Sequence, residues 1–322
     1  MSSSRREFLA GLAAAGVLAS VPRAAHASWR ASLLYPPLDP LALAAFDTPL
    51  HRGETAIRAG CAAITWNGKD TQAIEEIAAL GYAGIQLRAN AVEEFPDPHA
   101  LRDLLAQHKL TFVAISSGVT SLDPAVRQSQ LETHVQHAKY LHEAGGLYLQ
   151  LIGDGFKGRR TWSAPDYKLQ GEIFTEIAKR AADYGIRTGF HNHMDTIGQA
   201  PEAVDAILGA SDPNYVELEL DTAHYAQGGG DPAAIIRKYG RRLLFLHLKD
   251  VKNAASKSGY EFAELGQGRI DFTAVFAALH EVHFRGWAVV ELDGERAGST
   301  LTPKESAAMS LRYLREKLGV GA

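Results

Sequence analysis

Four apolar segments in the second half of the chain end at or near a residue that can bind a divalent cation. These residues are His191, Asp221, His247 and Glu291. Imidazole and carboxylate ligands together suit Mn²⁺, Zn²⁺, Co²⁺ or Fe²⁺ better than Ca²⁺. A divalent ion beside a carbonyl group polarises the oxygen and acidifies the neighbouring C–H bond. The sequence therefore predicts one divalent metal on these four residues, with Mn²⁺ as first choice; a metal-free network of histidine–carboxylate pairs is the alternative.

Proton transfer needs further side chains near such a metal. Four residues are candidates for proton transfer or for holding a substrate oxygen: Glu291, His193, His224 and Lys249. Structural roles are the alternatives. His193 would support His191, His224 would bind a backbone carbonyl, and Lys249 would pair with Asp293 or Glu219.

The ends of earlier apolar segments carry polar or aromatic side chains that could line a sugar pocket. They are Trp66, Gln86, Arg88 and Gln150. Trp66 is equally well explained as a core residue.

These residues are spaced by a regular alternation of short apolar segments and helical patterns. Strands are expected at 57–65, 83–88, 111–116, 146–152, 187–193, 216–221, 243–249 and 287–292. Helices are expected between them, and several begin with a proline in the first turn. Eight such units predict an α/β fold, a parallel (β/α)8 TIM barrel over residues 56–322. A doubly wound sheet is the alternative, but residues 64–68 after the first strand lack the glycine-rich loop of dinucleotide-binding folds.

Side-chain alternation predicts which residues face into the barrel. In the last three strands leucines and valines fill one face, so the polar face carrying the candidate ligands should point inward. Buried polar groups cost several kcal/mol unless they are paired or bind a metal. Arg187, Glu217 and Glu219 are expected to form an ion-pair layer below the site. Seven histidines lie in helical patterns and are expected at the surface: His99, His108, His134, His137, His142, His280 and His283.

Composition excludes several classes of protein. The chain of 322 residues is 46% hydrophobic and 22% charged, as is usual for globular proteins. The net charge of −4 argues against nucleic-acid partners. A single cysteine, Cys61, excludes an internal disulfide. No apolar run long enough to cross a membrane follows the first 30 residues.

The N-terminus has the features of an export signal. Arg5 and Arg6 precede an apolar stretch that ends in the cleavage pattern Ala25-His26-Ala27. We expect residues 1–27 to be a twin-arginine signal peptide, cleaved after Ala27, and the protein to be periplasmic; an N-terminal helix with a chance arginine pair is the alternative. Residues 28–55 are expected to form an N-terminal arm. Its hydrophobic part, 33–50, suggests a subunit contact in a homo-oligomer.

Several strings in the second half of the chain resemble the xylose-isomerase-like TIM barrel superfamily. They are FHNHMDT at 190–196, LDTAH at 220–224, GGGDP at 228–232, HLKDV at 247–251 and LGQGRIDF at 265–272. The superfamily contains sugar isomerases and epimerases, inosose dehydratase and an apurinic endonuclease branch. Its metal ligands are Glu, Asp, His and Glu on strands five to eight. The resemblance assigns the last three to Asp221, His247 and Glu291.

The chain departs from this pattern at His191, where epimerases place a glutamate that also transfers protons. Its His-x-His string is similar to the inosose dehydratase branch. The endonuclease branch needs early-strand histidines, and the ends of the first three strands offer none. The function expected first is a metal-dependent isomerase or epimerase of an unphosphorylated sugar or keto-sugar. The alternatives are a dehydratase or lyase acting on a keto-polyol or 3-keto-glycoside, and a sugar-binding barrel without catalysis.

Overall fold

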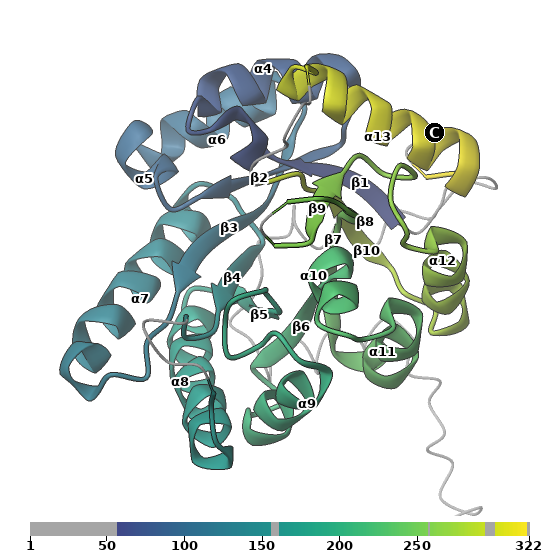
Figure 1. The fold of residues 1–322 in the computed structure, drawn as a ribbon. Helices are drawn as coiled ribbons and strands as arrows, with labels where there is room; N and C mark the ends of the chain where they lie inside the picture. Colours follow the sequence, from purple (N-terminus) through teal and green to yellow (C-terminus); the bar gives the residue numbers. More distant parts are fainter. Residues whose placement is uncertain (1–56, 156–160, 257, 294–299, 321–322) are drawn as a thin grey trace, which may run out of the picture. The chain divides into compact units, whose positions relative to one another are not determined.

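Eight parallel strands form a closed barrel in the computed structural model, which describes residues 57–155, 161–256, 258–293 and 300–320 (Figure 1). Around the barrel the strands follow the order β1-β10-β7-β6-β5-β4-β3-β2. Their bounds are β1 Ile57–Ala62, β2 Gly84–Arg88, β3 Thr111–Val119, β4 Tyr148–Ile152, β5 Arg187–His191, β6 Val216–Asp221, β7 Leu243–Leu248 and β10 Gly286–Val290. The predicted (β/α)8 barrel is therefore confirmed. The expected signal peptide (1–27) and arm (28–55) lie outside the described residues.

Helices follow the strands and surround the barrel (Figure 1). They are α4 Asp70–Leu80, α5 Ala91–Glu94, α6 Pro98–Gln107, α7 Arg127–Glu143, α8 Ala164–Ala182, α9 Pro201–Ala210, α10 Thr222–Gln227, α11 Pro232–Tyr239, α12 Phe272–Glu281 and α13 Pro303–Leu318, with 3-10 turns η1 Ala63–Trp66, η2 Pro124–Val126 and η3 Gly240–Arg242. Local signals explain their starts. Asp97 and Asp231 accept hydrogen bonds from the first backbone N–H groups of α6 and α11, and Thr302 with Glu305 forms a capping box on α13.

Hydrophobic side chains pack on both faces of the sheet. The larger cluster joins the strands to the helices, and a smaller one includes the inward residues Phe245 and Trp287. The ring of Phe245 stacks on Tyr148 with centroids 5.4 Å apart. Gly84 is required beside this cluster, because a Cβ atom there would lie 2.5 Å from Val113 and 2.6 Å from Trp287. The inward face thus contains apolar rings below the polar strand ends.

A hairpin that was not expected follows β7. Strands β8 (Asp250–Asn253) and β9 (Tyr260–Ala263) pair in antiparallel fashion at the end of the barrel (Figure 1). The buried carboxylate of Asp250 accepts hydrogen bonds from four backbone N–H groups: those of Val251, Gly266, Gly268 and Ile270. Asp250 therefore joins the loop at 266–270 to the start of the hairpin.

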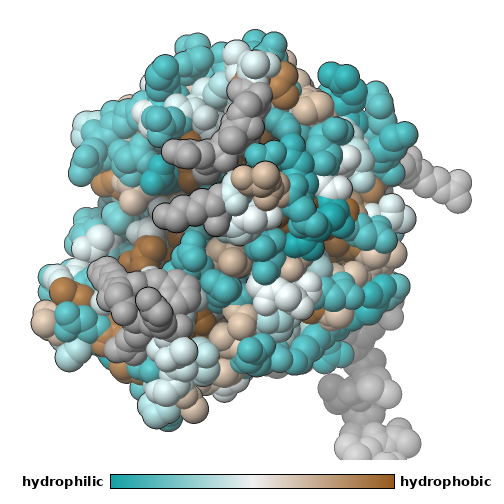
Figure 2. All heavy atoms as spheres, in the orientation of Figure 1, coloured by the Kyte–Doolittle hydropathy of each residue, from teal (hydrophilic) through white to brown (hydrophobic). Residues whose placement is uncertain are grey.

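The exposed surface is mainly polar. Figure 2 shows hydrophilic residues over much of the drawn face, interrupted by small hydrophobic areas. Among the described residues, the large hydrophobic side chains that are exposed are Val119, Val126 and Leu301. None of the described helices has the length and apolar character needed to span a membrane.

Candidate active site

The strand register brings candidate ligands from neighbouring strands together. His191 lies beside Glu219 across β5 and β6, and Asp221 lies beside His247 across β6 and β7. One donor atom from each of His191, Asp221 and His247 lies within 4.8 Å of the others, so these three residues could hold a metal ion. All three side chains are buried. Glu291, immediately after β10, reaches the same group through His247.

The ring of His247 separates two sets of partners. Its Nδ1 lies 3.1 Å from Glu291 Oε2 and 3.7 Å from Asp221 Oδ2. Its Nε2 lies 2.6 Å from Gln86 Oε1 and 2.9 Å from Glu219 Oε1. A proton on Nε2 would leave Nδ1 as a metal-binding nitrogen, the usual arrangement of a ligating histidine. Burial acts to lower the pKa of His247, but Glu219 and Glu291 outweigh it and hold this pKa well above its usual value.

Lys249 lies in the middle of the carboxylates. Its Nζ is 2.5 Å from Glu291 Oε1, 2.9 Å from Asp293 Oδ1 and 3.2 Å from Asp221 Oδ2. The side chain is fully buried, and Nζ lies 4.8 Å from the centroid of the Phe262 ring in the hairpin. Burial acts to lower the pKa of Lys249, but the carboxylates hold it well above its usual value. Lys249 is therefore an ammonium group that can bind an oxygen and not a base.

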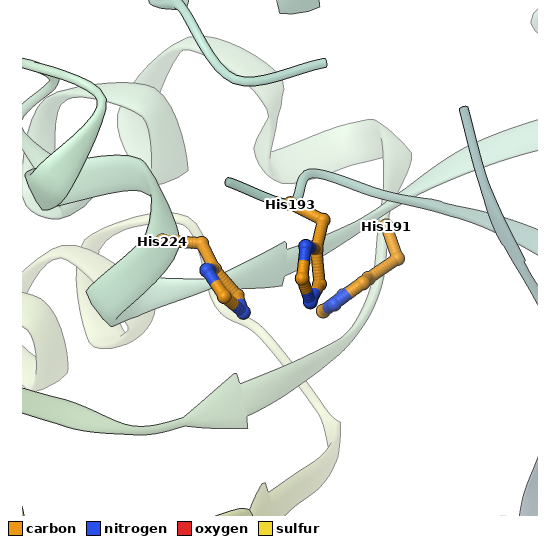
Figure 3. A group of neighbouring side chains, drawn as sticks. All are labelled: His191, His193 and His224. Atoms are coloured by element: carbon orange, nitrogen blue, oxygen red, sulfur yellow. The ribbon is translucent and has the colours of Figure 1, made fainter. Parts of the chain in front are cut away.

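His193 and His224 lie next to each other, with ring centroids 3.9 Å apart (Figure 3). Asp221 accepts a hydrogen bond from the backbone N–H of His224 at 2.8 Å as N-cap of α10, which positions this histidine. His193 Nδ1 lies 2.6 Å from the carbonyl oxygen of Met194, so it donates its proton there and leaves Nε2 as an acceptor. Burial lowers the pKa of His193 and, more strongly, that of His224.

Three neighbours of the site have roles that the sequence patterns did not assign: Glu219, Asn192 and Phe262. Glu219 was expected in a layer with Arg187 and Glu217, but it instead contacts the rings of His191 and His247 at 3.2 and 2.9 Å. Arg187 does pair with Glu217, through two hydrogen bonds. Alternation along β6 could have assigned Glu219 to the site, because it lies two residues before Asp221 on the same face.

Asn192 also holds the site together. Its amide accepts a hydrogen bond from the Asp221 N–H at 2.9 Å and donates one to the Asp221 carbonyl at 3.1 Å. It thereby joins the end of β5 to the end of β6. Phe262 is the other residue that sequence reasoning missed, since its place depends on the unexpected hairpin.

The four expected pocket residues have different surroundings. Gln86 and Gln150 are buried and hydrogen-bonded to each other, and Gln86 supports His247. Trp66 packs in the core and donates a hydrogen bond to Glu76 on α4, because the chain leaves β1 at Ala62 and turns through η1. Arg88 is exposed at the end of β2. The structure thus brings the glutamines to the metal-binding residues, but neither Trp66 nor Arg88 has a described contact with them.

The expectation that all helical histidines lie at the surface was wrong for His134. It is buried on α7, where its Nδ1 lies 2.6 Å from Ser117 Oγ on β3; His137 contacts the same oxygen at 2.8 Å. Burial lowers the pKa of His134 to about 4. Burial also lowers the pKa of His137, so the uncharged form of both rings is favoured where they contact β3.

The residues of the centre fit a divalent cation. Four carboxylates surround it, and Lys249 is the one ammonium group among their described contacts: Glu219, Asp221, Glu291 and Asp293. Asp221 Oδ2 and His247 Nδ1 are buried and lack a hydrogen bond of good geometry. Burial acts to raise the pKa of Asp221, but Lys249 outweighs it and keeps this pKa well below its usual value. Ionised oxygens and an unsatisfied imidazole nitrogen are the donors that such an ion needs.

Comparison with known proteins agrees with this architecture. An inosose dehydratase of Geobacillus kaustophilus (strain HTA426) is 29% identical over 294 residues, which cover 80% of this chain and 93% of the relative. A crystal structure of the IOLI protein with a bound zinc atom superposes with a TM-score of 0.68 at 17% identity, covering 80% of this chain and 96% of that chain. A structure of L-ribulose 3-epimerase superposes with a TM-score of 0.68 at 17% identity, covering 82% and 94%. Residues 74–317 match the family described as xylose isomerase-like TIM barrel, and the chain belongs to this family.

Proposed function

We propose that this protein is a metal-dependent dehydratase that removes water from an unphosphorylated keto-polyol or 3-keto-glycoside. The observation that carries the proposal is the pair of imidazoles His193 and His224, whose centroids are 3.9 Å apart. Two proton-transfer groups on one side of a substrate can serve neighbouring carbons, as elimination of water requires. The similarity to inosose dehydratases supports the same reaction.

Each side chain then has a defined task. His193 Nε2 accepts the proton from the carbon next to the carbonyl group, because its Nδ1 is held by the Met194 carbonyl. The electrons of this C–H bond form the new C=C bond as the C–O bond at the next carbon breaks. His224 donates a proton to the departing hydroxyl, which leaves as water. Lys249 binds the carbonyl oxygen as negative charge develops there.

Asp221, His247 and Glu291, with His191, would hold the divalent ion, which supplies polarisation of the substrate carbonyl when bound. Glu291 serves better as a ligand than as a base. Burial acts to raise its pKa, but His247 and Lys249 together outweigh burial and hold it well below its usual value. An acid this strong is a weak proton acceptor.

Isomerisation or epimerisation of a sugar is the second candidate. Epimerisation moves a proton between opposite faces of one carbon, and Glu291 on the β10 side offers a carboxylate away from His193 on the β5 side. This reaction requires Glu291 to act as a base in spite of its contacts with His247 and Lys249.

Incubation of the metal-loaded protein with keto-inositols and 3-keto-glucosides in D₂O separates these outcomes. A dehydratase yields an ultraviolet-absorbing unsaturated product and one water per turnover. Deuterium in a recovered sugar without loss of water would support the isomerase or epimerase instead. Binding of these compounds with neither change would overturn both and leave a sugar-binding barrel. His193→Ala should abolish elimination, whereas His280→Ala, at an exposed position on α12, should not change it.

We also propose export to the periplasm through the signal at residues 1–27, which suits an unphosphorylated substrate. Cell fractionation should find the wild-type protein in the periplasm. Replacement of both Arg5 and Arg6 by lysine should retain it in the cytoplasm. Equal periplasmic amounts of both forms would contradict the proposal.

A further inference from the structure

Three imidazoles at the mouth of the barrel form a donor set of their own. One ring nitrogen from each of His191, His193 and His224 lies within 4.8 Å of the others. Figure 3 shows the rings of His191 and His193 converging, with that of His224 beside them. This set contains no carboxylate, in contrast to His191, Asp221 and His247.

Two of the rings already have an oxygen atom near Nδ1. His193 Nδ1 donates to the carbonyl oxygen of Met194 at 2.6 Å. His191 Nδ1 faces Glu219 Oε1 at 3.2 Å. Both arrangements leave Nε2 with its lone pair available, and ligating histidines generally have such a backbone or carboxylate partner on the other nitrogen.

The third ring already has a cation next to it. His224 Nε2 lies 3.1 Å from the ammonium of Lys249 and 3.9 Å from Asp221 Oδ2. The Lys249 ammonium can move away from this nitrogen and still have its charge balanced, because its Nζ lies 2.5 Å from Glu291 and 2.9 Å from Asp293. The His224 ring must then release the Met194 N–H, a long contact of 3.3 Å, when Nε2 becomes the ligand.

His191 belongs to both donor sets, but its one available lone pair can serve only one ion. If His191 joins His193 and His224, then Asp221, His247 and Glu291 remain as a second set of three, with His247 Nδ1 3.7 and 3.1 Å from the two carboxylates. We propose that His191, His193 and His224 hold a second divalent cation of the zinc class, next to the ion of the carboxylate set.

Charge allows both ions. The four carboxylates and Lys249 leave three negative charges, and ligating imidazoles add none. Two divalent ions turn this surplus into one positive charge, and one ion leaves one negative charge, so either occupancy is within one unit of neutrality. Three imidazoles without carboxylates select Zn²⁺ or Co²⁺ over Mn²⁺. A second ion would occupy the imidazoles of His193 and His224, so the proton transfers of the proposed dehydration could take place only while this set is empty.

Metal titration of the chelator-treated protein tests the proposal. We expect two Zn²⁺ per chain by elemental analysis, and strong visible absorption of four-coordinate Co²⁺ from the imidazole set. His193→Ala should retain one Zn²⁺ and lose the Co²⁺ absorption. The variant should bind Zn²⁺ at the three-histidine set more than about 100-fold more weakly than the wild type. Removal of a residue that only supports a ligand costs about 10- to 100-fold.

Matched variants keep the result interpretable. His247→Ala should also retain one Zn²⁺ but keep the Co²⁺ absorption, and His280→Ala should retain both ions. His193 is only partly buried, so its replacement should not disrupt the fold. Circular dichroism of His193→Ala, and of His193→Asn as a second replacement, checks that the fold is intact. One Zn²⁺ per chain in the wild type, or two in folded His193→Ala, would overturn the proposal. Because the readout is metal content, failure here leaves the dehydratase proposal untouched.

Discussion

Replacement of Lys249 by methionine should test the electrostatics of the site directly. Methionine is close to lysine in length and apolar, so it keeps the packing and removes the charge. In the folded protein Lys249 Nζ contacts Asp221, Glu291 and Asp293 at 3.2, 2.5 and 2.9 Å, and the side chain has no exposed surface. Its loss leaves three neighbouring carboxylates without this cation.

The expected loss of stability is large. Breaking a buried ion pair by removing one partner costs about 3–5 kcal/mol, because the remaining charge stays buried and unpaired. At about 2–4 °C per kcal/mol for domains of about 150–250 residues, the midpoint of thermal unfolding should fall by about 6–20 °C. The loss should be smaller at pH 5 than at pH 8, since protonation of a carboxylate relieves the repulsion. A divalent cation should restore part of the stability by supplying positive charge to the same oxygens.

Thermal and urea unfolding of metal-free protein, with and without added Mn²⁺ or Zn²⁺, measures these effects. Lys252→Met is the matched control. Lys252 lies three residues further along the chain, in strand β8, and pairs with Glu261 of β9 at the surface. Such a surface pair contributes about 0–1 kcal/mol. A Lys249→Met protein that unfolds within about 2 °C of the wild type without metal would refute the reasoning.

Three further changes follow from other contacts. His134 has a pKa of about 4 when folded and an ordinary value of 6.5 when unfolded. The unfolded chain therefore binds more protons in this window, and acidification from pH 6.5 to 4 should cost up to about 3 kcal/mol of unfolding free energy, a loss that His134→Gln should remove. Asn192→Ala removes two buried hydrogen bonds to the backbone of Asp221, so urea unfolding should show a loss of about 2–6 kcal/mol, with weaker metal binding. Gly84→Ala places a Cβ atom 2.5 Å from Val113 and should cost about 1–3 kcal/mol by thermal unfolding.

Controls for these changes are available in the same chain. His280→Gln, at an exposed position, should leave the pH profile of stability unchanged, and an identical profile for His134→Gln and the wild type would contradict the assignment. Asn253→Ala, on the exposed hairpin, should have little effect. Gly209→Ala in α9 meets nothing within 4 Å and should stabilise the protein by up to about 1 kcal/mol. Equal effects of Gly84→Ala and Gly209→Ala would exclude overpacking as the cause.

Side-chain alternation was sufficient to predict much of the centre. A strand must present alternate residues to opposite faces. Leu246 and Leu248 of β7 and Val290 of β10 lie on the outward face, which placed His247 and Glu291 on the inward face. The barrel was predictable for a different reason. Strands and helices alternate regularly along the chain, and few folds accommodate that order. In a closed barrel of parallel strands, the polar carboxyl ends of all the strands must lie at the same end of the barrel.

Contacts made by loops and by helix faces were not predictable in this way. The 3-10 turn after Ala62 rotates Trp66 toward Glu76, although the apolar pattern continues to residue 65. His134 is buried because Ser117, on another element, offers it a hydrogen bond. The three carboxylates around Lys249 come from different parts of the chain, and only the closed barrel brings them together.

Closure of the barrel has a consequence for the order of events during synthesis. Strand β1 pairs with β10, near the C-terminus, through five residues from Ile57 to Cys61. The nascent chain cannot complete this seam until β10 has left the ribosome, and Glu291 follows β10 directly. The metal-binding residues can therefore assemble only after β10 and Glu291 have been translated, and an ion can bind to the complete set only after β10 has closed the barrel.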